Sequence, residues 1–523
     1  MIFLARLLVS LLFTANIHCT RRKKYPSKLD ISCSFVRIFA QYFWFVAKLT
    51  RFFASQLCYN RKTMGKSIER KVPTELGTES VGKLLMQYAI PAIIAQTASS
   101  IYHTIDSIFI GHIPDVGALA ISGLATTFPL MNLSAAFGAM VGVGGATQLS
   151  VRLGQRDYDS AKIILGNLVT LNIIVGIIFA AIALIFLDPI LYFFGASEST
   201  LPHARAFMEV ILYGNIVTHL YFGINAAIRA AGHPKQAMFA TILTVCANAI
   251  LAPIFIFVLG WGIRGAALAT ILAQCITLMW QIKLLSNPDE LLHLQRGIYH
   301  LRSNIVKSIL AIGMSPFFIN AAACLVVIII NKGLRGYSND GDMSIAAYGI
   351  SNRIQFIFVM VVLGLTQGMQ PIVGYNYGAR KANRVKETLK LTIIWATVVT
   401  TLGFLIGELM PATVAKAFTT EEALIDSSVK AMRIMFMFMP FIGFQLVTTN
   451  FFQSIGLVNK SIFLSLTRQI LLLIPLLLIL PLFLGENGVW YSMPISDSIA
   501  ALLTVIMLVL QFREWRTQKD GIN

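Results

Sequence analysis

Residues 91–111 read PAIIAQTASSIYHTIDSIFIG, an apolar segment of helix length that carries Asp106 in its second half. A charged side chain near the middle of a bilayer costs at least ~2.5–3.5 kcal/mol, so such residues usually face a cavity and mark an ion or substrate path. The alternative is a carboxylate that a neighbouring polar side chain holds for packing. Because almost no other acid lies so deep in an apolar segment, we interpret Asp106 as functional.

The composition of the 523-residue chain is that of a polytopic membrane protein and excludes a soluble enzyme. Hydrophobic residues make up 56% of it and charged residues 13%, and the mean hydropathy is +0.72. A spanning helix needs roughly 20 apolar residues, and its backbone groups must be satisfied within the segment. The sequence predicts twelve such helices, at about 84–111, 118–151, 160–187, 203–231, 237–259, 264–285, 304–332, 343–376, 386–410, 425–455, 461–484 and 489–512.

Residues 1–63 differ from the rest of the chain. They hold eleven Lys and Arg against one acid, Asp30, and so contribute ten of the eighteen net positive charges. The segment 1–20 has the outline of a signal peptide but lacks a small-residue cleavage site. Met64 is an alternative start, so we interpret the basic extension 1–63 as an upstream segment that is not part of the native protein or as a dispensable tail, and we expect a chain beginning at Met64 to insert and transport normally.

Lys and Arg concentrate in the loops that follow the even-numbered helices. The loops 112–117 (HIPDVG) and 188–200 (DPILYFFGASEST) carry none. By the positive-inside rule, both chain ends lie in the cytoplasm and the number of spans is even. We expect a multi-pass protein of a bacterial inner membrane. The basic residues are Arg152, Arg156, Lys162, Arg229, Lys235, Lys283, Arg296, Arg302, Lys307, Arg380, Lys381, Arg384, Lys386, Lys460, Arg513, Arg516 and Lys519.

The chain repeats itself with an offset of about 225 residues. Residues 118–162 recur near 344–386, where Gly154 matches Gly378, and IRAAGHPK (228–235) echoes FQSIGLVNK (452–460). The repeat predicts two six-helix bundles, 64–300 and 301–523, related by a pseudo-twofold axis along the membrane normal. A binding site is then expected between them near mid-membrane. The alternative is an old duplication retained for packing alone.

The most specific stretches are IDSIFIG, RLGQRDYDSAK, RAAGHPK, NAILAPIFI with GIRGAALAT, and QGMQPIVGYNYGARKANRV. On these stretches the chain resembles the multidrug and toxic compound extrusion (MATE) family, nearest its bacterial DinF-like and MepA-like branch, over about residues 75–515. The resemblance implies an all-α V-shaped fold of two six-helix bundles. It also implies export of organic cations and amphipathic compounds in exchange for protons or sodium ions.

The family's cation site maps onto Asp106, Asn248 and Thr270. Many relatives read N-x-x-x-D in the fifth helix, where this chain has Asn248 followed by Ala252. Since a sodium ion needs compensating negative charge, the loss of this acid favours proton coupling. The internal repeat aligns Asp106 with the neutral Asn331, so we expect ion coupling in the first half of the chain.

Two further acids lie within apolar spans. Glu209 lies nearer the outer end of the fourth helix and aligns with Arg433, so an ion pair is at least as plausible there as ligand binding. Asp497 of the twelfth helix is similarly placed and is a secondary candidate. The glycine run 138–147 is not a phosphate loop, since no Lys-Ser/Thr follows it.

We therefore expect a gradient-driven antiporter that exports drugs or metabolites, with H⁺ preferred over Na⁺ as the coupling ion. We expect no other cofactor, no metal site, no nucleic acid and no obligatory protein partner. The six cysteines show neither CxxC spacing nor nearby histidines. A flippase for lipid-linked saccharides is the alternative function, and a membrane-embedded enzyme is a distant third, since no P-loop or clustered catalytic residues occur. The natural substrate and the oligomeric state stay open.

Overall fold

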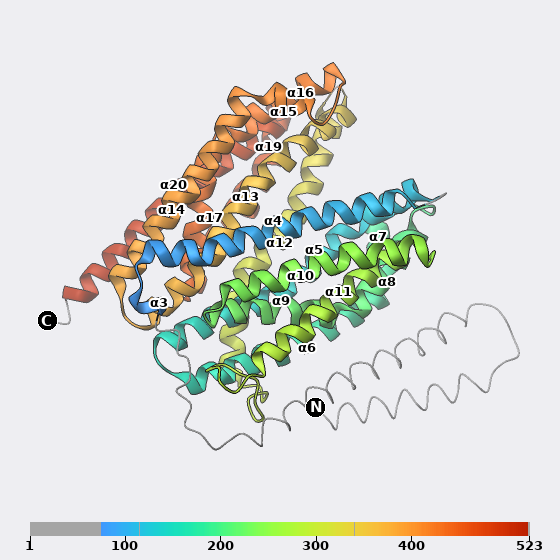
Figure 1. The fold of residues 1–523 in the computed structure, drawn as a ribbon. Helices are drawn as coiled ribbons and strands as arrows, with labels where there is room; N and C mark the ends of the chain where they lie inside the picture. The colour runs from blue at the N-terminus through green and yellow to red at the C-terminus, as the bar shows by residue number, and fades with distance from the viewer. Residues whose placement is uncertain (1–74, 114–115, 339, 521–523) are drawn as a thin grey trace, which may run out of the picture. The chain divides into compact units, whose positions relative to one another are not determined.

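The computed structural model describes residues 75–113, 116–338 and 340–520, and the basic extension 1–63 lies outside them. These residues belong to one compact unit, Lys71–Asn523. The described chain is built of helices joined mostly by short loops, with a longer connection, 286–302, between the helices that end at Leu285 and begin at Ser303 (Figure 1). The predicted all-helical fold is therefore confirmed.

Nine helices in the described part are long and apolar enough to cross a membrane, and two bent pairs raise the number to eleven. α4, with 31 residues, corresponds to the first predicted span. Apolar side chains such as Ile185 and Phe483 are 69% and 80% exposed, as expected of surfaces that face lipid. The protein is therefore a multi-pass membrane protein.

The helices follow the predicted order. In the first half of the chain they are α3 (Glu75–Thr78), α4 (Val81–Gly111), α5 (Gly117–Gly154), α6 (Tyr158–Ile185), α7 (Leu187–Phe193), α8 (Leu201–Tyr213), α9 (Asn215–Ala230), α10 (Pro234–Pro253), the π-helix η2 (Ile254–Val258) and α11 (Gly262–Leu285). In the second half they are α12 (Ser303–Tyr337), α13 (Gly341–Gly378), α14 (Ala382–Leu409), α15 (Pro411–Lys416), α16 (Glu422–Phe436), α17 (Met439–Ser454), α18 (Val458–Leu466), the π-helix η3 (Thr467–Leu473), α19 (Ile474–Leu484) and α20 (Glu486–Asp520).

The fourth predicted helix of each half is bent rather than straight. α8 and α9 meet at 55°, and α16 and α17 meet at 48°. Pro440, at the start of α17, cannot continue a preceding helix. At the first bend, a Cβ on Gly214 would lie 2.3 Å from Ile271 Cδ1, so the close approach of α11 requires glycine.

The internal repeat extends to backbone conformation. Arg156 and Arg380 occupy matching positions in the turns after α5 and α13, and both adopt left-handed backbone, with φ of 60° and 58°. The two repeat-matched glycines make reciprocal contacts. A Cβ on Gly154 would lie 1.9 Å from Tyr375 O, and one on Gly378 would lie 2.1 Å from Val151 O. The duplicated turns therefore pack directly against each other.

We call the helix end that carries Arg152 and Arg380 the basic end. The halves meet toward this end, where α5 packs along α12 and α4 packs between α10 and α13 (Figure 1). Arg384 donates to the carbonyls of Leu76 and Glu79 at 3.2 and 2.6 Å. These hydrogen bonds therefore link the basic ends of the two halves. The assignment of bundle boundaries at 64–300 and 301–523 stays a prediction.

Candidate functional site

The structure brings Asp106, Asn248 and Thr270 together from α4, α10 and α11. Their exposed fractions are 7%, 1% and 8%. The tight connection after η2, with left-handed Gly260 and Gly262, turns α11 back along α10, and α4 packs against α10. One carboxylate, one amide and one hydroxyl thus meet inside the first half.

The amide of Asn248 is fully satisfied in only one of its two orientations. In the orientation that leaves it unsatisfied, Nδ2 lies 3.1 Å from Thr270 Oγ1 but also 3.2 Å from the N–H of Thr270, and the amide oxygen faces Asp106 Oδ1 at 3.2 Å. In the other, Nδ2 donates to Asp106 Oδ1 at 3.2 Å, and the amide oxygen accepts from Thr270 N and Oγ1 at 3.2 and 3.1 Å. Amide nitrogen and oxygen are assigned from their hydrogen-bond partners.

The satisfied orientation fits an ionised Asp106. An ionised carboxylate only accepts hydrogen bonds, so it requires the NH₂ group of Asn248 to face it. In this arrangement the amide links the carboxylate of α4 to the hydroxyl and N–H of Thr270 in α11.

Ala252 lies one helical turn from Asn248 and is fully buried. A methyl group therefore stands where the resemblance implies a second acid. In the part of the chain that the structure describes, no group of three or more His, Cys, Asp or Glu residues is arranged to hold a metal ion. Cys246, Cys275 and Cys324 are free thiols.

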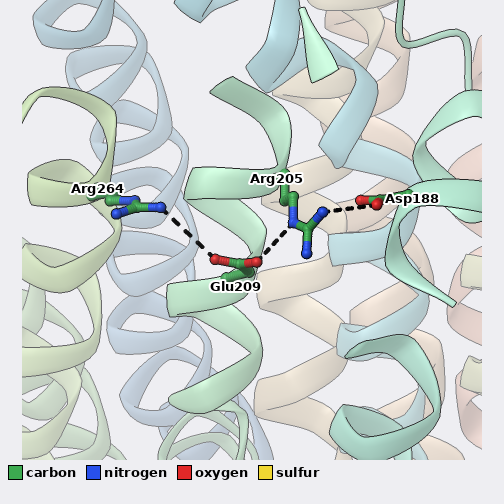
Figure 2. A network of polar contacts seen from close by, with 4 residues as sticks. All are labelled: Asp188, Arg205, Glu209 and Arg264. Carbon is green, nitrogen blue, oxygen red and sulfur yellow. Dashed lines mark hydrogen bonds and ion pairs between the residues drawn. The ribbon is translucent and has the colours of Figure 1, made fainter. Parts of the chain in front are cut away.

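Glu209 belongs to an ion-pair network away from the basic end (Figure 2). Arg205 lies between two acids, with Nε 2.8 Å from Glu209 Oε1 and Nη1 2.8 Å from Asp188 Oδ2. Arg264 approaches the other oxygen of Glu209 at 4.0 Å. This network ties α7, α8 and α11 together, so its geometry fits the structural interpretation of Glu209.

Asp497 of α20 is also paired. Its Oδ1 accepts from Nε of Arg468 at 2.6 Å, and the two side chains are 7% and 23% exposed. Asn331 lies in α12, and its buried Oδ1 has no hydrogen-bond partner among the described residues. These secondary candidates are thus separate from the three-residue site around Asp106.

Sequence reasoning missed two polar groups within apolar spans. Arg468, which is 23% exposed, interrupts the apolar segment 461–484, and an arginine within a predicted span was a signal that could have identified it. His219 of α9 is fully buried and lies 3.2 Å from Ser134 Oγ of α5, which in turn donates to Asn215 Oδ1 of α9 at 2.6 Å. These single polar residues on α5 and α9 gave no comparable pattern.

Comparison with known proteins gives consistent matches. The family description MatE matches residues 91–254 and again 312–479, in agreement with the internal repeat. The multidrug export protein MepA of Staphylococcus haemolyticus is 26% identical over 431 residues, covering 82% of this chain and 93% of that protein. MepA of Staphylococcus aureus (strain MRSA252) is 25% identical over 430 residues, covering 82% and 94%.

Solved structures share the fold. A multidrug resistance MATE family transporter in an outward-facing conformation has a TM-score of 0.79 at 23% identity, covering 85% of this chain and 99% of that one. A MATE structure in a bent conformation has a TM-score of 0.80 at 22% identity, covering 86% and 99%. A MOP superfamily transporter from Pyrococcus furiosus has a TM-score of 0.78 at 23% identity, covering 85% and 98%.

Proposed function

Since the chain belongs to the MatE family, we propose that it is a secondary active antiporter that exports organic cationic or amphipathic compounds in exchange for protons. The MepA relatives are named multidrug export proteins, which supports export of drugs by this chain. The observation that carries the choice of ion is the buried site with one carboxylate, Asp106, and with Ala252 in place of a second.

The coupling step follows from the contact between Asn248 and Asp106. When Asp106 is ionised, Asn248 donates to it and links α4 to α10. Protonation removes the charge that α4 holds in the site and weakens this charge-assisted hydrogen bond. A cationic drug and a proton then compete for one state of the first half.

The distribution of Lys and Arg supports a cytoplasmic basic end. A single cysteine introduced at Gly378 or Gly232 should then be shielded from impermeant thiol reagents in intact cells, while one at Ser197 should be labelled. The reversed labelling pattern would refute this orientation. Asp115, a second outward position by the same reasoning, lies outside the described residues.

The alternative of a saccharide-lipid flippase would favour a strongly cationic interior. The structure pairs Arg468 with Asp497, so this arginine adds no net charge at depth. We therefore retain drug export as the proposal.

The decisive experiment is ethidium transport by proteoliposomes under an imposed pH gradient and, separately, an imposed Na⁺ gradient. Asp106→Asn fixes the neutral form at nearly constant volume and should abolish pH-driven transport while the protein stays folded. Asp342→Asn, which removes a carboxylate that is 84% exposed, is the control. Ala252→Asp should increase the response to Na⁺. Wild-type rates for Asp106→Asn under a pH gradient would show that α4 is not the coupling element.

A further inference from the structure

A row of buried polar side chains leads from the candidate cation site along α11 toward the basic end. Its members recur every three or four residues, which places them on one face of the helix. They are exposed by 8% or less in every case. They are Thr270, Gln274, Thr277 and Gln281. At about 1.5 Å per residue, the row extends the polar character of the site by about 16 Å.

Neighbouring helices contribute to the same row. Thr244 of α10, one turn from Asn248, is hydrogen-bonded through Oγ1 to Thr277 Oγ1 at 2.8 Å. Thr218 of α9 donates to Gln274 Oε1 at 2.6 Å. Thr244 Oγ1 also lies 3.1 Å from the carbonyl oxygen of Ala240, so either hydroxyl can donate in the contact between Thr244 and Thr277.

Gln281 is the member of this row that ordinary packing between helices does not explain. Its side chain is 0% exposed, yet neither its Nε2 nor its Oε1 has a hydrogen-bond partner in the described part of the chain. Leaving a buried amide unpaired costs about 1–3 kcal/mol for each group. Buried groups of this kind are commonly satisfied by internal water.

The row ends beside a small hollow at the basic end. Leu284 and Leu285, in the last turn of α11, line this hollow together with His233 and Glu290. His233 Nε2 lies 3.2 Å from Glu290 Oε2, and the two side chains are 29% and 21% exposed. The partly exposed His233 and Glu290 therefore share a hollow with the turn of α11 that follows Gln281.

We propose that this row is a hydrated proton path from Asp106 through Thr277 and Gln281 to His233 and Glu290 at the basic end. Successive polar groups are about one turn, 5.4 Å, apart along the axis, which matches two hydrogen bonds of about 2.8 Å through one water. The proton then leaves through the interior of the first half, so the drug can use a separate route. This inference rests on the proposed proton-coupled function.

The test is Gln281→Leu in the full chain. If the glutamine only fills space, replacing an unpaired buried amide by an apolar side chain of similar size is neutral or stabilising. A proton path predicts instead that pH-driven ethidium transport falls about tenfold or more. The equilibrium Kd for ethidium, measured by fluorescence polarisation, should stay within about twofold, because the variant removes no drug contact.

The matched control is Gln445→Leu in α17, which removes a buried glutamine with an unpaired Oε1 from the second half. Gln281→Asn, which keeps an amide, should recover part of the rate. If Gln281→Leu does not fold, Thr277→Val interrupts the same path with a side chain of nearly the same shape. This variant should also slow transport.

Three outcomes would overturn the path. If Gln281→Leu, or Thr277→Val where the former does not fold, transports at the wild-type rate, the path alone is refuted. Equal slowing by Gln445→Leu, or a parallel loss of ethidium affinity, would indicate a general packing effect. If the wild-type protein shows no pH-driven ethidium transport, both the path and the proposed function fail.

Discussion

The contact between Gly154 and Gly378 offers a direct test of how the halves move. A Cβ added at Gly378 would lie 2.1 Å from Val151 O and 3.2 Å from Gln155 N. Close C···O contacts in proteins are about 3.3–3.6 Å, so α5 and α13 must separate by more than 1 Å. Overpacking of this kind costs about 1–3 kcal/mol, which shifts a two-state equilibrium by about 5- to 150-fold. We predict that Gly378→Ala disfavours the conformation in which the basic ends touch.

The assay is the distance distribution between spin labels at Gln155 and Arg380, both exposed, in lipid nanodiscs. Gly378→Ala should move population from a short to a long distance. The control is Gly349→Ala in the same helix, where an added Cβ meets nothing within 4 Å. Alanine there should only add helix propensity, worth up to ~1 kcal/mol. If the two variants give the same distance distribution, the close glycine contact does not govern closure of the basic end.

Three further predictions concern stability, measured as thermal unfolding in detergent. Asp157→Ala should cost about 0.5–2 kcal/mol, because Asp157 caps α6 by accepting from Ser160 N at 3.2 Å. Hydrogen bonds from the side chain and then the backbone N–H of Ser160 hold the pKa of Asp157 below its usual value, so the contribution of the carboxylate is fully present above about pH 4 and is lost as the pH falls below that; a difference between wild type and Asp157→Ala that stays unchanged as the pH is lowered would contradict this. Arg380→Gly should stabilise the chain by about 1 kcal/mol, because the left-handed backbone strains a side chain there but not glycine; a lower unfolding temperature would count against it. Asp497→Asn should destabilise the protein by about 1.5–3 kcal/mol, because it weakens a charge-assisted hydrogen bond to Arg468, whose side chain is 23% exposed; the double variant Arg468→Leu with Asp497→Leu should recover most of this loss, and equal losses would show that the ion pair is not the cause.

The helices were predictable because each apolar run is longer than a bilayer span and is flanked by charged or glycine-containing loops. The predicted 264–285 and the observed Gly262–Leu285 agree within two residues. The bend at Gly214 was not predictable, because its cause is a tertiary contact with Ile271. The second bend had a local signal in the sequence, because Pro440 interrupts a long apolar run.

The candidate site was predictable only in part. Asp106 stood out because a carboxylate in an apolar helix is rare, and the resemblance supplied Asn248 and Thr270. The pairing of Arg468 with Asp497 depends on how η3 and α20 cross, which periodicity within either helix does not specify. Gln281 gave no signal, because an isolated glutamine near a helix end is ordinary until its burial and its lack of partners are known.

The two halves use the space between their fifth and sixth helices differently. In the first half, Asn248 and Thr270 bridge α10 and α11; in the second, Arg468 and Asp497 bridge the repeat-matched η3 and α20. Asn248 and Thr270, the polar groups beside Asp106, are neutral, whereas Asp497 is held by a cationic partner, so loss of its charge would break an ion pair. This difference supports the proposal that the coupling ion acts on the first half, with the ion pair of the second half retained as a packing contact.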